Sequence, residues 1–252
     1  MKDLKAYVKE QLENAKREFN EIGGLESLKS GDWLMKIIHK SFTTYWNNAN
    51  IEYFESKYGT KDKDKIAKKL ISVASKNAAI LGGMTGATMS ANEIIGFFTA
   101  GEGGIGIPAN VAIAVTAIGG DIIFLTRIQL QLISNLGKLY GAPLDPDDPE
   151  DILTIFAFAL GGSVSEGAGK FGMKVGGKLA GRAAKDVFKK EVLKNLKKLA
   201  TKASMKILQK TIVKYAVPLA SMGFGTAWNF TSTKVIAKIA VKHFEQRVKE
   251  NA

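Results

Sequence analysis

Three side chains in a mostly apolar stretch of the sequence could form a ligand pocket. Asp121 stands inside an otherwise apolar helix that we predict from Val111 to Leu132, and Arg127 follows on the same helix. A carboxylate in such surroundings needs a partner, because burying an unpaired charge is costly. Asp121 therefore either pairs inside a helical bundle or lines, together with Arg127 and Tyr140, the pocket of a helical enzyme or ligand-binding protein that handles a lipid or a peptide.

The sequence offers few residues for catalysis or for metal binding. It contains no cysteine, which excludes thiol nucleophiles and cysteine metal sites. Only His39 and His243 are present, far apart in the chain, and no HExxH pattern occurs. We therefore expect no catalytic residue, no cofactor and no metal, and a binding role is favoured over an enzymatic one.

An acidic turn between two predicted helices holds the densest group of carboxylates: Asp145, Asp147, Asp148, Glu150 and Asp151. So many oxygen ligands suggest calcium, but the group lacks the order and the central glycine of an EF-hand loop. Capping of the next helix by Asp147 or Asp148 is the favoured interpretation. A side-chain carboxylate there accepts hydrogen bonds from the first N–H groups and stabilises the positive end of the helix.

Two glycine patterns are similar to phosphate-binding motifs. Gly101, Gly103 and Gly106 match GxGxxG, and the stretch from Gly172 to Lys178 matches GxxxxGK. The first pattern lacks a surrounding strand–helix–strand arrangement, and the second is followed by Leu179 where a P-loop has Ser or Thr. We interpret the first as a link between helices and the second as part of a row of small residues.

Positive charge is concentrated in the last third of the chain. The net charge is +12, and residues 170–252 hold 19 Lys and Arg against four acids, whereas residues 1–169 hold 17 against 20. Much of the excess lies in two rows with a spacing of four residues: Lys170, Lys174, Lys178, Arg182, and Lys194, Lys198, Lys202, Lys206, Lys210, Lys214. Rows of this kind favour an anionic partner.

Three interpretations of the basic rows stay open at this point. Basic residues near an anionic membrane surface contribute about 1 kcal/mol each, so a handful would suffice for attachment. The same residues could simply form a solvated face. Nucleic acid is the third interpretation, but residues 170–215 contain few aromatic side chains for base stacking.

The elements that must position these residues are helices. Apolar residues recur at intervals of three and four, without alternating runs of β-branched residues, so we predict an all-α protein. The expected architecture is a single multi-helix bundle with long glycine-rich and lysine-rich amphipathic helices. We predict helices at about Lys2–Asn20, after Asp32, from near Lys61 and at about Ala227–Val248. The predicted division is an N-terminal helical extension, 1–60, and a main helical domain, 61–252.

The middle of the chain is apolar and rich in glycine, with 20 of the 26 glycines between Gly82 and Gly181. One segment here, Ile105–Leu125, is long enough to span a bilayer. It contains Pro108 and Asp121, and a central aspartate costs about 2.5–3.5 kcal/mol on insertion scales. Buried helices of a bundle are therefore favoured, with bilayer insertion as the alternative.

Several short motifs resemble the EcsC protein family. They are Gly119-Gly120-Asp121 through Arg127 to Tyr140-Gly141, the acidic turn after them, Val217-Pro218, Gly223, Gly225, Asn229 and Phe244-Glu245-Gln246-Arg247. The resemblance covers about residues 60–250. It implies a link to a bacterial ABC transporter and to secretion, and it carries over no catalytic residue.

These observations together predict a non-enzymatic accessory protein at a membrane surface. Its basic helices would contact anionic lipid or a membrane complex of the ABC-transporter type. The first residues of the chain lack the apolar run of a secretory signal, so we expect a cytoplasmic protein, peripheral to the inner face of the membrane.

Overall fold

A computed structural model describes residues 2–48, 50–86, 109–159, 195–211 and 222–251. Within these ranges every regular element is an α-helix, and the helices pack against one another, which confirms the predicted all-α bundle. The two glycine patterns at 101–106 and 172–178 lie outside the described residues. The same is true of Lys170, Lys174, Lys178, Arg182, Lys194 and Lys214.

Four helices form the N-terminal part of the chain: α1 (Lys2–Glu21), α2 (Gly24–Ser30), α3 (Asp32–Asn48) and α4 (Ile51–Tyr58). α1 is amphipathic, and Val8, Leu12 and Ala15 lie buried on one stripe, as the spacing of its apolar residues predicts. α4 begins at an asparagine cap, because the Asn50 side chain accepts a hydrogen bond from the Tyr53 N–H at 3.0 Å.

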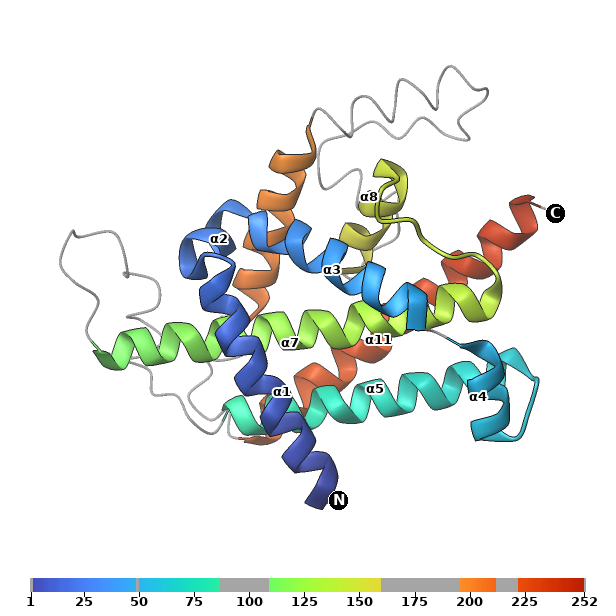
Figure 1. The fold of residues 1–252 in the computed structure, drawn as a ribbon, viewed down its shortest axis with the longest axis horizontal. Coiled ribbons are helices and arrows are strands. Elements are labelled where there is room, and N and C mark those ends of the chain that lie inside the picture. The colour runs from blue at the N-terminus through green and yellow to red at the C-terminus, as the bar shows by residue number, and fades with distance from the viewer. Residues whose placement is uncertain (1, 49, 87–108, 160–194, 212–221, 252) are drawn as a thin grey trace.

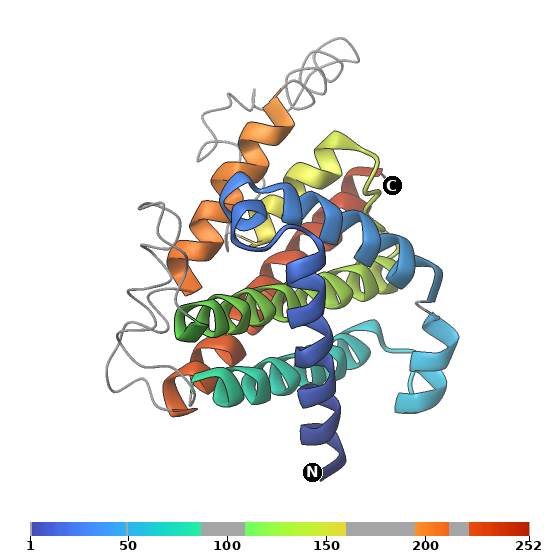
Figure 2. The same ribbon diagram turned by 60° about the vertical axis from the view of Figure 1, so that its left-hand side comes forward.

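The remaining elements are α5 (Lys63–Gly86), α7 (Ala109–Tyr140), α8 (Pro149–Ala159), a helix at residues 195–211, and α11 (Met222–Asn251). The long helices α5, α7 and α11 pack on one another, and α1 crosses both α7 and α5 (Figures 1 and 2). α5 and α7 run antiparallel. Thr85 near the end of α5 meets Asp121, whereas Asp64 near its start meets Tyr140.

One hydrophobic core contains side chains from both sides of the predicted boundary at residue 60. Phe19 and Trp33 are as fully buried as Phe156, Phe158 and Phe244. α1 and α3 both pack against α7. Residue 60 lies in the turn between α4 and α5, but the helices before this turn are part of the same bundle as those after it.

The helix at 195–211 is fixed to the turn between α2 and α3. Ser204 accepts a hydrogen bond from the Trp33 indole and donates one to the Leu28 carbonyl, while Thr201 donates to the Ser30 carbonyl. Gly31 has φ +86°, and a Cβ atom here would overlap the backbone at Ala200 and Thr201. Glycine is therefore required both for the turn and for the close approach of the two segments.

The acidic turn caps α8, as predicted. The Asp148 carboxylate accepts the Glu150 N–H at 2.8 Å, and Pro149 occupies the first helical position, where its missing N–H costs nothing. Asp151 accepts the Asp145 N–H at 2.8 Å and pairs with Arg247 of α11. Of the helices that the structure describes, none is both long enough and apolar enough to cross a bilayer.

Candidate functional site

Asp121 is a buried residue that bonds to a neighbouring helix. Its side chain is 1% exposed, and it accepts a hydrogen bond from the Thr85 hydroxyl of α5 at 3.2 Å. Thr85 also donates to the Leu81 carbonyl of its own helix at 3.0 Å. Asp121 thus joins α7 to α5, which is the structural one of the two roles that its sequence position predicts.

Arg127 pairs with a glutamate of α1 that the sequence does not single out. Glu18 is 4% exposed, and its carboxylate forms ion pairs with both Arg127 and Lys40 of α3, the latter at 2.7 Å. The three residues come from α1, α3 and α7. The two ion pairs therefore tie the N-terminal helices to the centre of the bundle.

Tyr140 lies at the far end of α7, where its hydroxyl donates a hydrogen bond to Asp64 at 2.8 Å. Burial and the neighbouring Asp64 carboxylate raise the pKa of Tyr140 well above its usual value. Nineteen residues of helix separate it from Asp121, which corresponds to about 28 Å. The structure therefore does not bring Asp121, Arg127 and Tyr140 into one pocket.

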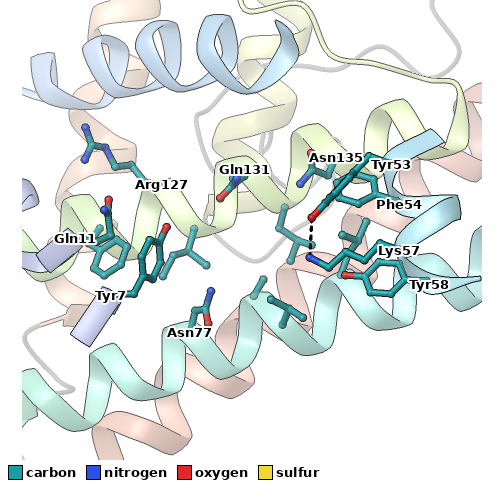
Figure 3. Close-up of a pocket in the computed structure, with 16 residues that line it drawn as sticks. Tyr7, Gln11, Tyr53, Phe54, Lys57, Tyr58, Asn77, Arg127, Gln131 and Asn135 are labelled. Atoms are coloured by element: carbon teal, nitrogen blue, oxygen red, sulfur yellow. Dashed lines mark hydrogen bonds between the residues drawn. The ribbon is translucent and has the colours of Figure 1, made fainter. Parts of the chain in front are cut away.

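Arg127 nevertheless lines a cleft, shown in Figure 3, of about 390 Å³. Its floor is formed by α5 and α7, with α1 at one end and α4 at the other. Tyr7, Gln11 and Arg127 lie at the α1 end, the aromatic residues of α4 lie at the opposite end, and carboxamides lie between them (Figure 3). The lining residues are Tyr7, Gln11, Tyr53, Phe54, Lys57, Tyr58, Leu70, Val73, Ala74, Asn77, Phe124, Arg127, Ile128, Gln131, Leu132 and Asn135.

Two polar groups of this cleft are suited to a ligand. The Asn77 side-chain oxygen is buried and has no hydrogen-bond partner, and an unsatisfied buried acceptor costs about 1–3 kcal/mol. The Lys57 ammonium donates to the Tyr53 hydroxyl at 3.1 Å and lies 5.2 Å from the centre of that ring. The hydrogen bond to Tyr53 raises the pKa of Lys57.

The cleft could not be found from local sequence patterns. Its carboxamides Gln11, Asn77, Gln131 and Asn135 come from three helices that are far apart in the chain. The one local signal is the spacing in α4, which places Tyr53, Phe54, Lys57 and Tyr58 within two turns. The sequence does not show which helix this aromatic group faces.

The lysine row of the 195–211 helix is exposed over the part that the structure describes. Lys198, Lys202, Lys206 and Lys210 face solvent, whereas Leu199, Ala203 and Leu208 are buried against the bundle. Residues 195–211 include no aspartate or glutamate. This face, Lys198 to Lys210, is called the basic face below.

A second cavity, an apolar groove of about 540 Å³, lies beside the basic face. Helices α3, α7, α8 and α11 and the 195–211 helix all contribute to it. Lys210 belongs to both features, because it is one of the lining residues of the groove. The lining residues are Leu34, Ile122, Leu125, Thr126, Gln129, Leu130, Ile133, Ile155, Ile207, Lys210, Thr211, Ala227, Trp228, Thr231, Ser232, Val235 and Ile236.

His243 and the acidic turn have structural contacts in the bundle. His243 of α11 packs edge-on against Phe158, with ring centres 5.5 Å apart. Burial, and next the charge of Arg247, lower the pKa of His243. Within the described part of the chain, no cluster of three or more His, Cys, Asp or Glu side chains could hold a metal ion.

The fold and these sites define an all-α bundle with a polar cleft, an apolar groove and an exposed basic face. No protein-family model, curated protein or solved structure matches the chain. Its function is therefore inferred from its own residues.

Proposed function

We propose that the protein is a non-enzymatic membrane-surface protein that binds anionic lipid through the basic face. The observation that carries this proposal is the row of exposed lysines on the 195–211 helix, whose residues include no aspartate or glutamate. An association with a membrane complex of the ABC-transporter type, which the resemblance to the EcsC family implies, stays a prediction.

The energies of lipid attachment fit four lysines on one face. Each basic residue near an anionic surface contributes about 1 kcal/mol, so four would contribute about 4 kcal/mol, or roughly a thousandfold in affinity. Salt screens this attraction, because the Debye length falls from about 30 Å at 0.01 M to about 8 Å at physiological ionic strength. Binding should therefore require anionic lipid and should weaken with salt.

Co-sedimentation with vesicles tests the proposal. The protein is mixed with vesicles of phosphatidylcholine alone or with phosphatidylglycerol added, at low and at high salt. We expect pelleting with the anionic vesicles at low salt, and release at high salt or in carbonate. The triple variant Lys198→Glu, Lys202→Glu, Lys206→Glu should no longer pellet, with its helical circular-dichroism spectrum unchanged.

A matched control variant distinguishes the effect of the basic face on vesicle binding from the effect of the net charge. Lys68, Lys69 and Lys76 of α5 are also exposed, and their replacement by glutamate changes the net charge by the same amount. This control should pellet much more than the first triple variant. Equal loss in both variants would mean that total charge rather than the basic face decides binding. Salt-sensitive binding to duplex DNA, in the absence of vesicle binding, would favour nucleic acid instead.

The polar cleft supports a second candidate function, the binding of a small ligand. Four carboxamide side chains line it among apolar residues, and each carboxamide offers both a donor and an acceptor. The unpartnered oxygen of Asn77 adds a specific requirement for a donor. A short peptide combines such groups with apolar side chains, so peptide binding is the form in which we propose this second function.

A mixture of random pentapeptides passed over immobilised protein tests this candidate. We expect retained peptides, identified by mass spectrometry, and amidation of their carboxyl termini should weaken retention because Lys57 lies at one end of the cleft. Asn77→Leu, Gln131→Leu should abolish retention, whereas Gln129→Leu on the same helix lines the apolar groove and should not. The peptide function would be excluded if the protein retains no peptide. It would also be excluded if the double variant Asn77→Leu, Gln131→Leu retains as much peptide as the single variant Gln129→Leu.

A further inference from the structure

We infer that the apolar groove holds the single acyl chain of an anionic lipid, with the lipid headgroup at Lys210. This inference rests on the proposed function and specifies it, because it assigns a lipid to a built site in addition to a charged surface. The groove and the basic face meet at Lys210, which is both exposed and part of the groove lining.

The lining of the groove matches a hydrocarbon chain. Leucine, isoleucine, valine, alanine and tryptophan make up most of it, and the charged side chain in the lining is Lys210. The polar residues are threonines, a serine and one glutamine, and Thr126, Gln129 and Thr231 belong to this group. The volume of about 540 Å³ lies within the range of about 300–1,000 Å³ found for small-molecule sites.

The lysines beside the groove favour an apolar ligand that has an anionic group. Lys206 lies one helical turn before Lys210, and Lys202 lies one turn before Lys206, so the groove opens next to a row of positive charge. A carboxylate or phosphate at this rim meets favourable charge, while the attached chain removes apolar surface from water at about 25 cal/mol per Å². A neutral apolar ligand would gain only the free energy of burying its apolar surface.

The fluorescence of Trp228 can report binding in the groove, because this residue lines the groove and is half-buried. The probe is undecanoate with a terminal bromine, which quenches tryptophan fluorescence on contact, and the comparison is the matching bromoalcohol. We expect saturable quenching by the bromoacid and at least about tenfold weaker binding of the bromoalcohol. Trp228→Phe should lose this quenching, although Trp33 and Trp46 remain.

A matched pair of variants localises the binding. Val235 lines the groove and is 43% exposed, whereas Val248 of the same helix is 38% exposed and lies outside the groove. Val235→Asp places a carboxylate in the apolar lining of the groove and should weaken bromoacid binding at least about tenfold. Val248→Asp should bind like the wild type. Lys210→Gln should weaken bromoacid binding and leave the bromoalcohol unchanged.

The outcomes distinguish this inference from the proposed function, because the bromoacid is used below the concentration at which it forms micelles and without vesicles. Absence of saturable quenching, or equal quenching in both aspartate variants, overturns the acyl-chain site even if vesicles bind. Saturable quenching that depends on Val235 and Lys210, in a protein that binds no vesicles, supports the acyl-chain site and excludes only the surface attachment.

Discussion

Gly82 of α5 and Gly225 of α11 face each other, and no side chain separates their two backbones. A Cβ atom on Gly82 would overlap the Gly225 carbonyl, and a Cβ atom on Gly225 would overlap the Gly82 carbonyl. α5 and α11 form the most extensive helix–helix contact among the described elements. The two glycines therefore set the distance between the helices that carry the floor of the polar cleft and one wall of the apolar groove.

Either substitution, Gly82→Ala or Gly225→Ala, should lower the free energy of unfolding by about 1–3 kcal/mol, because the helices must move apart. Urea denaturation measures this change. Gly137→Ala in α7 is the control, since an added Cβ there would come no closer than 3.3 Å to a neighbour. Its better helix propensity, about 1 kcal/mol, should compensate for that contact. Equal stability of all three variants would contradict the close contact.

The ion pair between Glu18 and Arg127 should show strong coupling in a double-mutant cycle. Glu18→Gln, Arg127→Gln and the double variant should give a coupling energy of about 1–3 kcal/mol, because both groups are largely removed from water. Lys40 is 63% exposed at its side chain, so Lys40→Gln should change the free energy of unfolding by less than about 1 kcal/mol. A coupling energy near zero would show that the pair does not join α1 to α7.

Replacing Ser204 by alanine should destabilise the protein through Trp33. The Trp33 indole donates to Ser204, and without the hydroxyl this buried N–H has no acceptor there. The expected loss is about 1–3 kcal/mol in the free energy of unfolding, measured by urea denaturation. Met205→Ala, at the next and exposed position, should be close to neutral. A neutral Ser204→Ala would contradict a stabilising hydrogen bond between Trp33 and Ser204.

His243 should make the stability dependent on pH in the weakly acidic range. Its pKa is lowered from 6.5 in the folded protein, first by burial and then by Arg247. The unfolded chain therefore binds more protons than the folded protein below about pH 6.5, and the free energy of unfolding falls as the pH drops towards the folded pKa. Above pH 7 this contribution is fully present.

The variant His243→Phe isolates the effect, because a phenylalanine can pack against Phe158 and Phe244 without titrating. Free energies of unfolding measured between pH 7.5 and 5 should fall less steeply for the variant than for the wild type. His39 is present in both proteins and cancels in the comparison. Parallel curves would show that His243 has the same pKa in the folded and unfolded states.

Secondary structure could be predicted well from the sequence because it depends on local patterns. The apolar stripe of α1, the aspartate cap of α8 and the proline at its start are all signals within a few residues. The helix α4 and its asparagine cap are not among the elements predicted from the sequence. The exposure of Lys198, Lys202, Lys206 and Lys210 also follows from helical spacing against a buried stripe.

The tertiary contacts of Asp121, Arg127 and Tyr140 could not be predicted from local sequence patterns. The sequence indicates that Asp121 needs a partner but not that the partner is Thr85, 36 residues earlier in the chain. It gives no sign that Arg127 pairs with Glu18, because that glutamate is one of many acids on an amphipathic helix. A shared pocket requires the three side chains to lie close together, but nineteen residues of the continuous helix α7 separate Asp121 from Tyr140.

The sequence by itself determined that the chain is helical, that it lacks thiol chemistry and that its positive charge lies in the last third. These properties follow from composition and from short-range periodicity. The tertiary structure alone decided which helix faces meet, and so created the polar cleft from α1, α4, α5 and α7 and the apolar groove beside Lys210. The reason is physical: a cavity is formed by side chains brought together by packing, and packing joins residues whose separation along the chain leaves no local trace.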